Sequence, residues 1–166
     1  NIFQTSSKGI LDAATAIMTT DTFPKVEISK IKYKSNQVTI YGFAKGSGMI
    51  APNMGTMLAY IFIETSLRKT DLKKLLHKNI ESTFNSISVD GDTSTNDTIM
   101  MFSTGLKNSK IKMNRSFFNQ LSLGVHSVML SLSKQIVSDG EGISKLIEVK
   151  VTNAKNKTQA TNVAFS

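Results

Sequence analysis

One threonine stands where its hydroxyl could act as a nucleophile. Thr56 follows Gly55 directly and precedes an apolar run that reaches Ile63, so it would open a buried strand. A threonine hydroxyl reacts poorly unless a base removes its proton, and its own α-amine can be that base when the threonine begins a chain. This chemistry requires cleavage of the bond between Gly55 and Thr56, which would leave an amine with a pKa of about 8.

The residue before the threonine is compatible with such a cleavage. Gly55 has no Cβ, so it can adopt backbone angles that other residues avoid and it lets a hydroxyl approach its carbonyl. A Gly-Thr pair at the start of a strand also has a simpler explanation, because it commonly forms a turn. On spacing alone the turn is the more frequent case.

The elements around Thr56 are expected to form a layered α/β domain, a sandwich of mixed sheets and helices. Apolar residues at helical spacing predict helices over 7–18, 72–84 and 117–136. Thr70 or Asp71 would cap the second helix, and the third would end at the Asp-Gly pair 139–140. Alternating and apolar runs predict a hairpin around the polar turn 34–37 and strands at 56–64, 87–89, 98–103 and 144–154. The strand after Thr56 is apolar on both faces, so we expect it to be central and covered by the two later helices. Residues 157–166 could begin another helix.

The composition is that of one folded domain and argues against several classes of function. The chain has 166 residues, of which 40% are hydrophobic and 19% charged, and it contains no cysteine, which excludes disulfides, thiolate metal sites and a cysteine nucleophile. Its net charge of +8 comes from scattered lysines, Lys25 among them, without interleaved aromatics. This favours a solvated basic surface over a nucleic-acid site. The absence of cysteine favours the reducing cytoplasm, and no apolar run approaches the roughly 20 residues of a membrane helix, so we expect a cytoplasmic protein without a membrane segment.

Two further patterns have residue types that could form metal or acid-base sites. The block 90–97 carries oxygen-bearing side chains at alternate positions: Asp90, Asp92, Ser94 and Asn96. A calcium loop would need glycine in place of Thr95 and a glutamate in place of Met101. His77 and His126 have no carboxylate pattern around them, so packed or solvated histidines are the expected case. We therefore expect no metal and no cofactor.

Four blocks of the sequence resemble one enzyme family. The blocks are "AIMTTDTFPK", "KGSGMIAPNMGTMLAYI", "VDGDTSTNDT" and "SDGEGISKLIEVKVT", and they occur in family order over nearly the whole chain. Together they are similar to the bifunctional ornithine acetyltransferase (glutamate N-acetyltransferase) family of arginine biosynthesis. The resemblance implies the fold of an N-terminal-threonine nucleophile enzyme. Gly55 departs from the alanine that is usual in the family's "PNMAT" motif, and it keeps the side chain small.

The resemblance also implies the roles of four residues. The precursor would cut itself between Gly55 and Thr56, and Thr56 would then take the acetyl group of N-acetylornithine and pass it to glutamate in a ping-pong reaction. Lys45 matches the family's substrate-binding lysine and Glu141 its substrate-binding acid. A lysine suits a substrate carboxylate and a glutamate suits an ammonium, although a solvated loop lysine and a helix-end glutamate are the plainer interpretations.

The family pattern extends beyond this chain at both ends, so we expect residues 1–166 to be a single partial catalytic domain with a candidate autoproteolytic boundary at 55/56. In the family the upstream region supplies an oxyanion hole and the tail supplies further substrate-binding residues. The hypothesis is that this chain alone stays uncut and inactive, while the full enzyme is a homo-oligomer of paired chains. The sequence leaves open whether acetyl-CoA is also a substrate. The alternatives are an aminopeptidase-like or amidase-like hydrolase with the same nucleophile, a non-catalytic domain and a polyanion-binding module.

Overall fold

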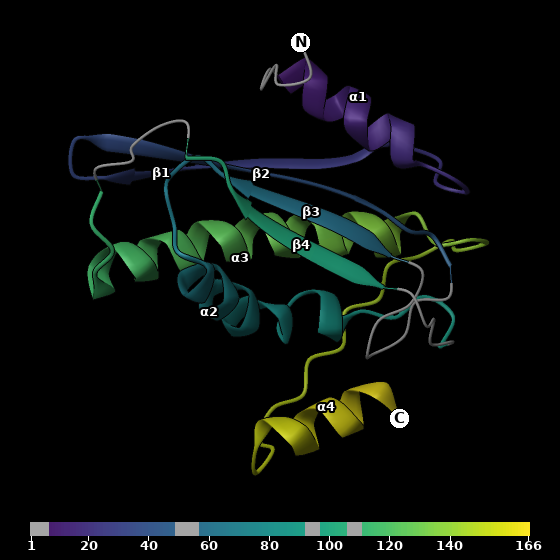
Figure 1. Ribbon diagram of the computed structural model, residues 1–166. Coiled ribbons are helices and arrows are strands. Elements are labelled where there is room, and N and C mark those ends of the chain that lie inside the picture. Colours follow the sequence, from purple (N-terminus) through teal and green to yellow (C-terminus); the bar gives the residue numbers. More distant parts are fainter. Residues whose placement is uncertain (1–6, 49–56, 92–96, 106–110) are drawn as a thin grey trace.

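A computed structural model describes residues 7–48, 57–91, 97–105 and 111–166. Over these ranges the chain is a mixed α/β domain with one four-stranded sheet and helices on both of its faces (Figure 1). The elements are α1 (Ser7–Ile17), β1 (Lys25–Tyr33), β2 (Asn36–Lys45), β3 (Leu58–Ile63), α2 (Lys69–Ile80), the short 3-10 helix η1 (Phe84–Ser86), β4 (Thr98–Ser103), α3 (Arg115–Ser138) and α4 (Lys157–Phe165). The mixed α/β class predicted from the sequence is confirmed, whereas the fold of an N-terminal-threonine nucleophile enzyme stays a prediction.

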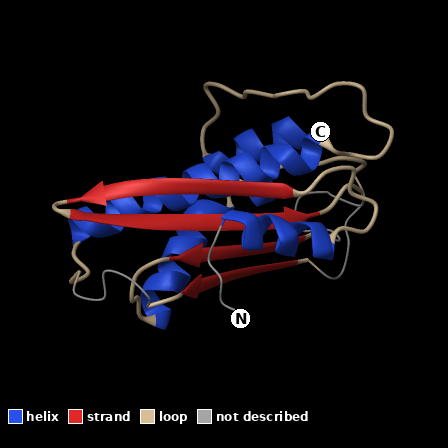
Figure 2. Cartoon of the chain, turned by 90° about the horizontal axis from the view of Figure 1, so that it is seen from above, coloured by secondary structure: helices blue, strands red, loops and turns tan. Residues whose placement is uncertain are grey.

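The sheet has the strand order β1-β2-β3-β4, and its strands lie side by side in Figure 2. The predicted hairpin is confirmed: β1 and β2 are antiparallel and turn at Lys34, whose φ of 54° is in the left-handed region. β2 and β3 are also antiparallel, whereas β3 and β4 are parallel. Parallel neighbours need a crossover connection, and α2 lies on that connection. The strand after Thr56 is therefore internal to the sheet, as the sequence predicted.

Helices α2 and α3 cover one face of the sheet, and α1 lies over the β1 and β2 side of the other face (Figure 1). The core forms between α3 and the sheet, where Ile40, Ile61, Val125 and Leu132 are fully buried. The helix approaches the sheet closely at Gly124. A Cβ there would stand 2.6 Å from Ile40 Cδ1, so only glycine fits without a shift of its neighbours.

Three local predictions were wrong. The N-cap of α2 is Arg68, which makes no side-chain cap bond, instead of Thr70 or Asp71, because the Asp71 carboxylate is engaged by the Arg68 guanidinium. Residues 87–89 and 144–154 form no strand, since among the described residues no strand pairs with them. An alternating pattern predicts a strand only where a neighbouring backbone supplies the hydrogen bonds.

The face of β3 that points away from α3 is also less covered than predicted. Ala59, Ile61 and Ile63 are buried, whereas the alternate residues Tyr60 and Phe62 are half-buried. On that face Phe43, Tyr60, Phe62 and Phe102 form a stacked row, with neighbouring ring centroids 5.0 to 5.9 Å apart. Helix α1 therefore does not cover this face completely.

Candidate functional site

The candidate site lies at the end of the sheet where β2 finishes and β3 and β4 start. Gly55 and Thr56, the predicted cleavage pair, lie outside the described residues. Met57 is the first described residue after them, and the pairing of β2 with β3 begins with Lys45 opposite Leu58. The predicted substrate lysine thus lies on the strand beside the one that continues from Thr56.

Lys45 is held by a side chain from the segment that follows α1. It is half-buried at the end of β2, and its Nζ donates a hydrogen bond to Thr19 Oγ1 at 2.9 Å. The neighbouring Thr20 shares a hydrogen bond of 2.5 Å with the hydroxyl of Ser47. The segment after α1 therefore lies along the end of β2 and orients the lysine.

Glu141 reaches the same place from the end of α3. Its N–H donates to the carbonyl of Ser47 at 2.8 Å. Its side chain is exposed, and its carboxyl carbon lies 3.6 Å from the position that a Cβ on Gly48 would occupy. Lys45 and Glu141 are thus brought to the same end of the sheet, although they are 96 positions apart in the sequence. A cationic and an anionic side chain at one end of the sheet can bind the two oppositely charged groups of a zwitterionic amino acid.

A buried ionic cluster lies beneath this end of the sheet. It consists of Asp21, Lys25 and Asp139. Lys25 is 0% exposed, and its Nζ donates to Asp21 Oδ1 and to Asp139 Oδ2, both at 2.5 Å. Lys25 was predicted to belong to a solvated basic surface, and that prediction was wrong because the two carboxylates compensate its charge inside the protein.

The cluster connects the segments that carry the candidate site residues. Asp21 Oδ1 also accepts from Gly46 N–H at 2.7 Å, directly after Lys45. Gly46 has a φ of 146°, a conformation that favours glycine. Asp139 Oδ2 accepts from Thr22 N–H at 2.9 Å, and Asp139 lies two positions before Glu141. One set of buried charges therefore fixes both the end of β2 and the end of α3.

The pKa values of the two acids reflect these contacts. Burial raises the pKa of the Asp21 carboxyl, but the Gly46 amide, the Lys25 ammonium and the Thr19 amide more than offset it, so the pKa is lowered. Burial likewise raises the pKa of Asp139, and the bonds from Lys25 and from the hydroxyl and amide of Thr22 bring it below its ordinary value. Both acids are therefore carboxylates near neutral pH.

Asp97 directly precedes β4 and contacts the residue that precedes β3. Its Oδ1 accepts a hydrogen bond of 2.5 Å from the N–H of Met57, the residue after Thr56. Burial raises the pKa of the Asp97 carboxyl, and the Met57 amide offsets this only in part. Within the block 90–97, residues 92–96 lie outside the described residues, so the structure does not test the calcium pattern.

Sequence reasoning missed Thr19, Asp21, Lys25, Asp97 and Asp139 as residues of this region. Thr19, Asp21 and Lys25 stand in the matched block at 16–25, and Asp97 in the block at 90–97, but nothing in either block indicated which side chains would meet. Asp139 stands in the matched block that starts at position 138, where its sequence context indicates only the end of a helix. In the parts of the chain that the structure describes, no three His, Asp or Glu side chains gather as metal ligands would. No described helix is both long and apolar enough to cross a membrane.

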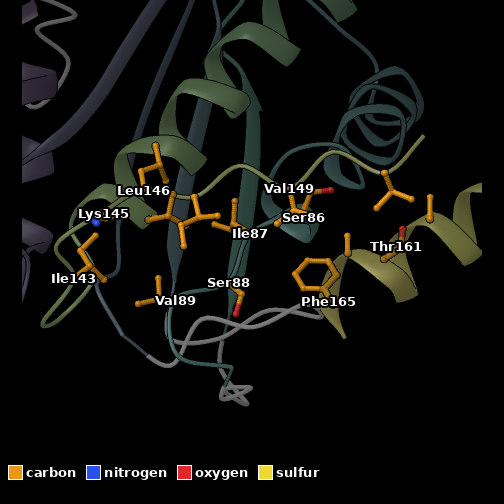
Figure 3. Close-up of a pocket in the computed structure, with 15 residues that line it drawn as sticks. Ser86, Ile87, Ser88, Val89, Ile143, Lys145, Leu146, Val149, Thr161 and Phe165 are labelled. Atoms are coloured by element: carbon orange, nitrogen blue, oxygen red, sulfur yellow. The ribbon is translucent and has the colours of Figure 1, made fainter. Parts of the chain in front are cut away.

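A separate pocket of about 490 Å³ lies between the segment 86–89, the extended segment 143–151 and α4 (Figure 3). Its lining is largely apolar, with Ile87, Leu146, Val149 and Phe165 among the labelled side chains. Neither Lys45 nor Glu141 lines it. The pocket is therefore distinct from the end of the sheet where Lys45 and Glu141 lie.

Comparison with known proteins gives a consistent family match. The sequence model of the ArgJ family matches residues 1–166. Similar curated proteins carry the name "Arginine biosynthesis bifunctional protein ArgJ". The one from Nitrobacter winogradskyi is 45% identical over 161 residues, covering 94% of this chain and 39% of the relative. The one from Streptococcus mutans is 46% identical over 156 residues, covering 93% and 39%. The chain thus spans 39% of the length of these relatives, and the resemblance noted in the sequence is confirmed.

Proposed function

Because the chain belongs to the ArgJ family, we propose that the whole protein is an acetyltransferase of arginine biosynthesis that moves the acetyl group of N-acetylornithine to glutamate. The observation that carries this proposal is that Lys45 ends β2, opposite the start of β3, while Glu141 is hydrogen-bonded to Ser47 only two positions after Lys45. The donor and the acceptor both carry an α-carboxylate, which Lys45 would bind, and Glu141 would bind the δ-ammonium of N-acetylornithine.

The proposed mechanism begins with self-cleavage. The Thr56 hydroxyl attacks the carbonyl carbon of Gly55, the peptide C–N bond breaks, and water hydrolyses the resulting ester. Gly55 then ends one chain with a carboxylate, and Thr56 begins the other with an α-amine. In the first transfer step this amine takes the proton of the hydroxyl while the oxygen attacks the acetyl carbon of N-acetylornithine. The amide bond breaks, ornithine leaves with the proton on its nitrogen, and an acetyl ester remains on Thr56.

The second transfer step reverses the first. The amine of glutamate attacks the acetyl ester, the new amide bond of N-acetylglutamate forms, and the Thr56 oxygen leaves and is protonated again. Donor and acceptor both carry an α-carboxylate, so the same Lys45 can serve both steps in turn. No cofactor takes part in this scheme.

An exchange assay tests the proposal. The purified whole protein is incubated with N-acetylornithine and glutamate, and ornithine, N-acetylglutamate and acetate are quantified. We expect ornithine and N-acetylglutamate in equal amounts, and neither product from the Thr56→Ala variant. Thr70→Ala, on the exposed start of α2, is the matched control and should keep full activity. Acetate formed at the same rate with and without glutamate would instead indicate the hydrolase, and added acetyl-CoA tests it as a second donor.

A further inference from the structure

Asp21 takes no part in the proposed transfer steps, although its carboxylate binds donors from two separate segments of the chain. Oδ1 accepts from the Gly46 N–H at 2.7 Å and from the Lys25 ammonium at 2.5 Å. Oδ2 accepts from the Thr19 N–H at 3.2 Å. Both oxygens of this buried carboxylate are therefore engaged, and they join the segment after α1 to the end of β2.

Two of these donors are directly connected to Lys45. The Gly46 N–H belongs to the planar peptide group that also contains the Lys45 carbonyl, so the bond to Asp21 fixes the orientation of that group. Thr19 reaches the other end of the same lysine, because its hydroxyl accepts from Lys45 Nζ at 2.9 Å. Asp21 thus holds the backbone beside Lys45 and, through Thr19, the position of the Lys45 ammonium group.

The charge of Asp21 strengthens this arrangement. The amides of Gly46 and Thr19 and the ammonium of Lys25 lower the pKa of the Asp21 carboxyl, so it is ionised near neutral pH. Hydrogen bonds to an ionised acceptor are stronger than those between neutral groups. A lysine side chain loses rotamer freedom when it binds a ligand, and one that is already held in place loses less of it on binding.

We propose that Asp21 is a positioning residue for substrate binding, which holds Lys45 where its ammonium group can receive the α-carboxylate of N-acetylornithine and of glutamate. This inference rests on the proposed function, in which Lys45 binds that carboxylate. The Asp21 side chain is only 1% exposed, so its effect on the reaction passes through Lys45. An interaction made equally in the ground state and the transition state changes KM and leaves kcat unchanged.

Two substitutions of Asp21 in the whole protein weaken the hold on Lys45. Asp21→Asn replaces one oxygen by an NH₂ group, which cannot accept from an amide N–H. Lys25 keeps Asp139 as its charged partner in this variant, so no buried ion is left alone. Asp21→Glu retains the charge beside Lys25 and moves the oxygens by one carbon–carbon bond of about 1.5 Å.

A double-mutant cycle tests whether the effect passes through the lysine. Each Asp21 variant is made alone and together with Lys45→Met, and kcat and KM for N-acetylornithine are measured by exchange. Gly124→Ala is the matched control for lost stability, because the added Cβ would meet Ile40 in the core and contact neither Asp21 nor Lys45. Thermal unfolding measures the stability of each protein.

We expect both Asp21 variants to raise KM about tenfold, with kcat within about twofold of the wild type. In the Lys45→Met protein the same substitutions should change KM by less than about twofold, because no lysine is left to position. Gly124→Ala should lower the unfolding midpoint and leave kcat and KM unchanged.

The two proposals fail in different ways. Wild-type KM in the Asp21 variants, or an equal rise in KM with and without Lys45, would overturn the positioning role while the proposed function stands. A rise in KM that Gly124→Ala reproduces would overturn it as well, because lost stability alone would then explain the effect. A wild-type protein that transfers no acetyl group would overturn the proposed function and this inference with it.

Discussion

Replacing Lys25 with methionine tests the buried cluster directly. The substitution removes the ammonium group and keeps an unbranched side chain of similar shape. Asp21 and Asp139 then face each other in a buried space without the charge that compensated them, since Lys25 is 0% exposed and lies 2.5 Å from an oxygen of each. Removing one partner of a buried ion pair costs about 3–5 kcal/mol. We therefore expect the free energy of unfolding to fall by about that amount at neutral pH.

The pH dependence follows from the direction of the pKa shifts. Asp21 and Asp139 have lowered pKa values in the folded protein, so they stabilise it above the ordinary aspartate pKa of about 3.9. This contribution is lost as the pH falls through their folded values. Without Lys25 the burial that raises both pKa values is less opposed, and protonation relieves the variant. The difference in unfolding free energy between the two proteins should therefore shrink as the pH is lowered from 7 towards about 4.

Urea unfolding followed by far-ultraviolet circular dichroism measures this difference, since the chain has no tryptophan. Lys30→Met, an exposed position on the same strand, is the matched control and should change stability by no more than about 0.5 kcal/mol. A triple variant with Asn at both acidic positions in addition to Lys25→Met should recover part of the loss. A Lys25→Met loss below about 1 kcal/mol that does not vary with pH would refute the reasoning, because it is what an exposed pair gives.

Three further changes test other parts of the account. Lys45→Met should raise KM for N-acetylornithine in the exchange assay by about ten- to a hundredfold, because a charged hydrogen bond to the substrate carboxylate is lost; an unchanged KM would contradict this role. Gly124→Ala should lower the free energy of unfolding by about 1–3 kcal/mol, since its Cβ would stand 2.6 Å from Ile40 Cδ1, and an unchanged urea midpoint would contradict the close contact. Asn114→Ala removes the N-cap of α3, which accepts from Phe117 N–H, and should cost about 1 kcal/mol in the same experiment; Asn114→Ser should recover most of it.

Much of the fold could be predicted because local patterns decide it. The hairpin follows from two alternating runs around a polar turn, and α3 from apolar residues at helical spacing over 24 residues. The segment 144–154 alternates equally well and yet forms no strand, with Ile147 79% exposed. Strand formation depends on a partner backbone, and no local pattern reports whether one is present.

The candidate site could be predicted only in part, for a related reason. The resemblance indicated Lys45 and Glu141 as substrate-binding residues, and the structure brings them to one end of the sheet. The contact of Lys25 with Asp139 could not be predicted, because Asp139 is 114 positions away and the charge of a lysine gives no sign of its burial. Residues distant in sequence decide whether a charge is buried, so the local pattern places Lys25 with the solvated lysines.

Mass spectrometry of the Thr56 peptide tests the central claim most directly. The whole protein is incubated with N-acetylornithine labelled in the acetyl group, without glutamate, then quenched in acid and digested. The account predicts a peptide that begins at Thr56 and carries one labelled acetyl group as an ester, and predicts that added glutamate removes the label. A protein that transfers acetyl groups at full rate with an intact bond between Gly55 and Thr56, or with no label on Thr56, would contradict it.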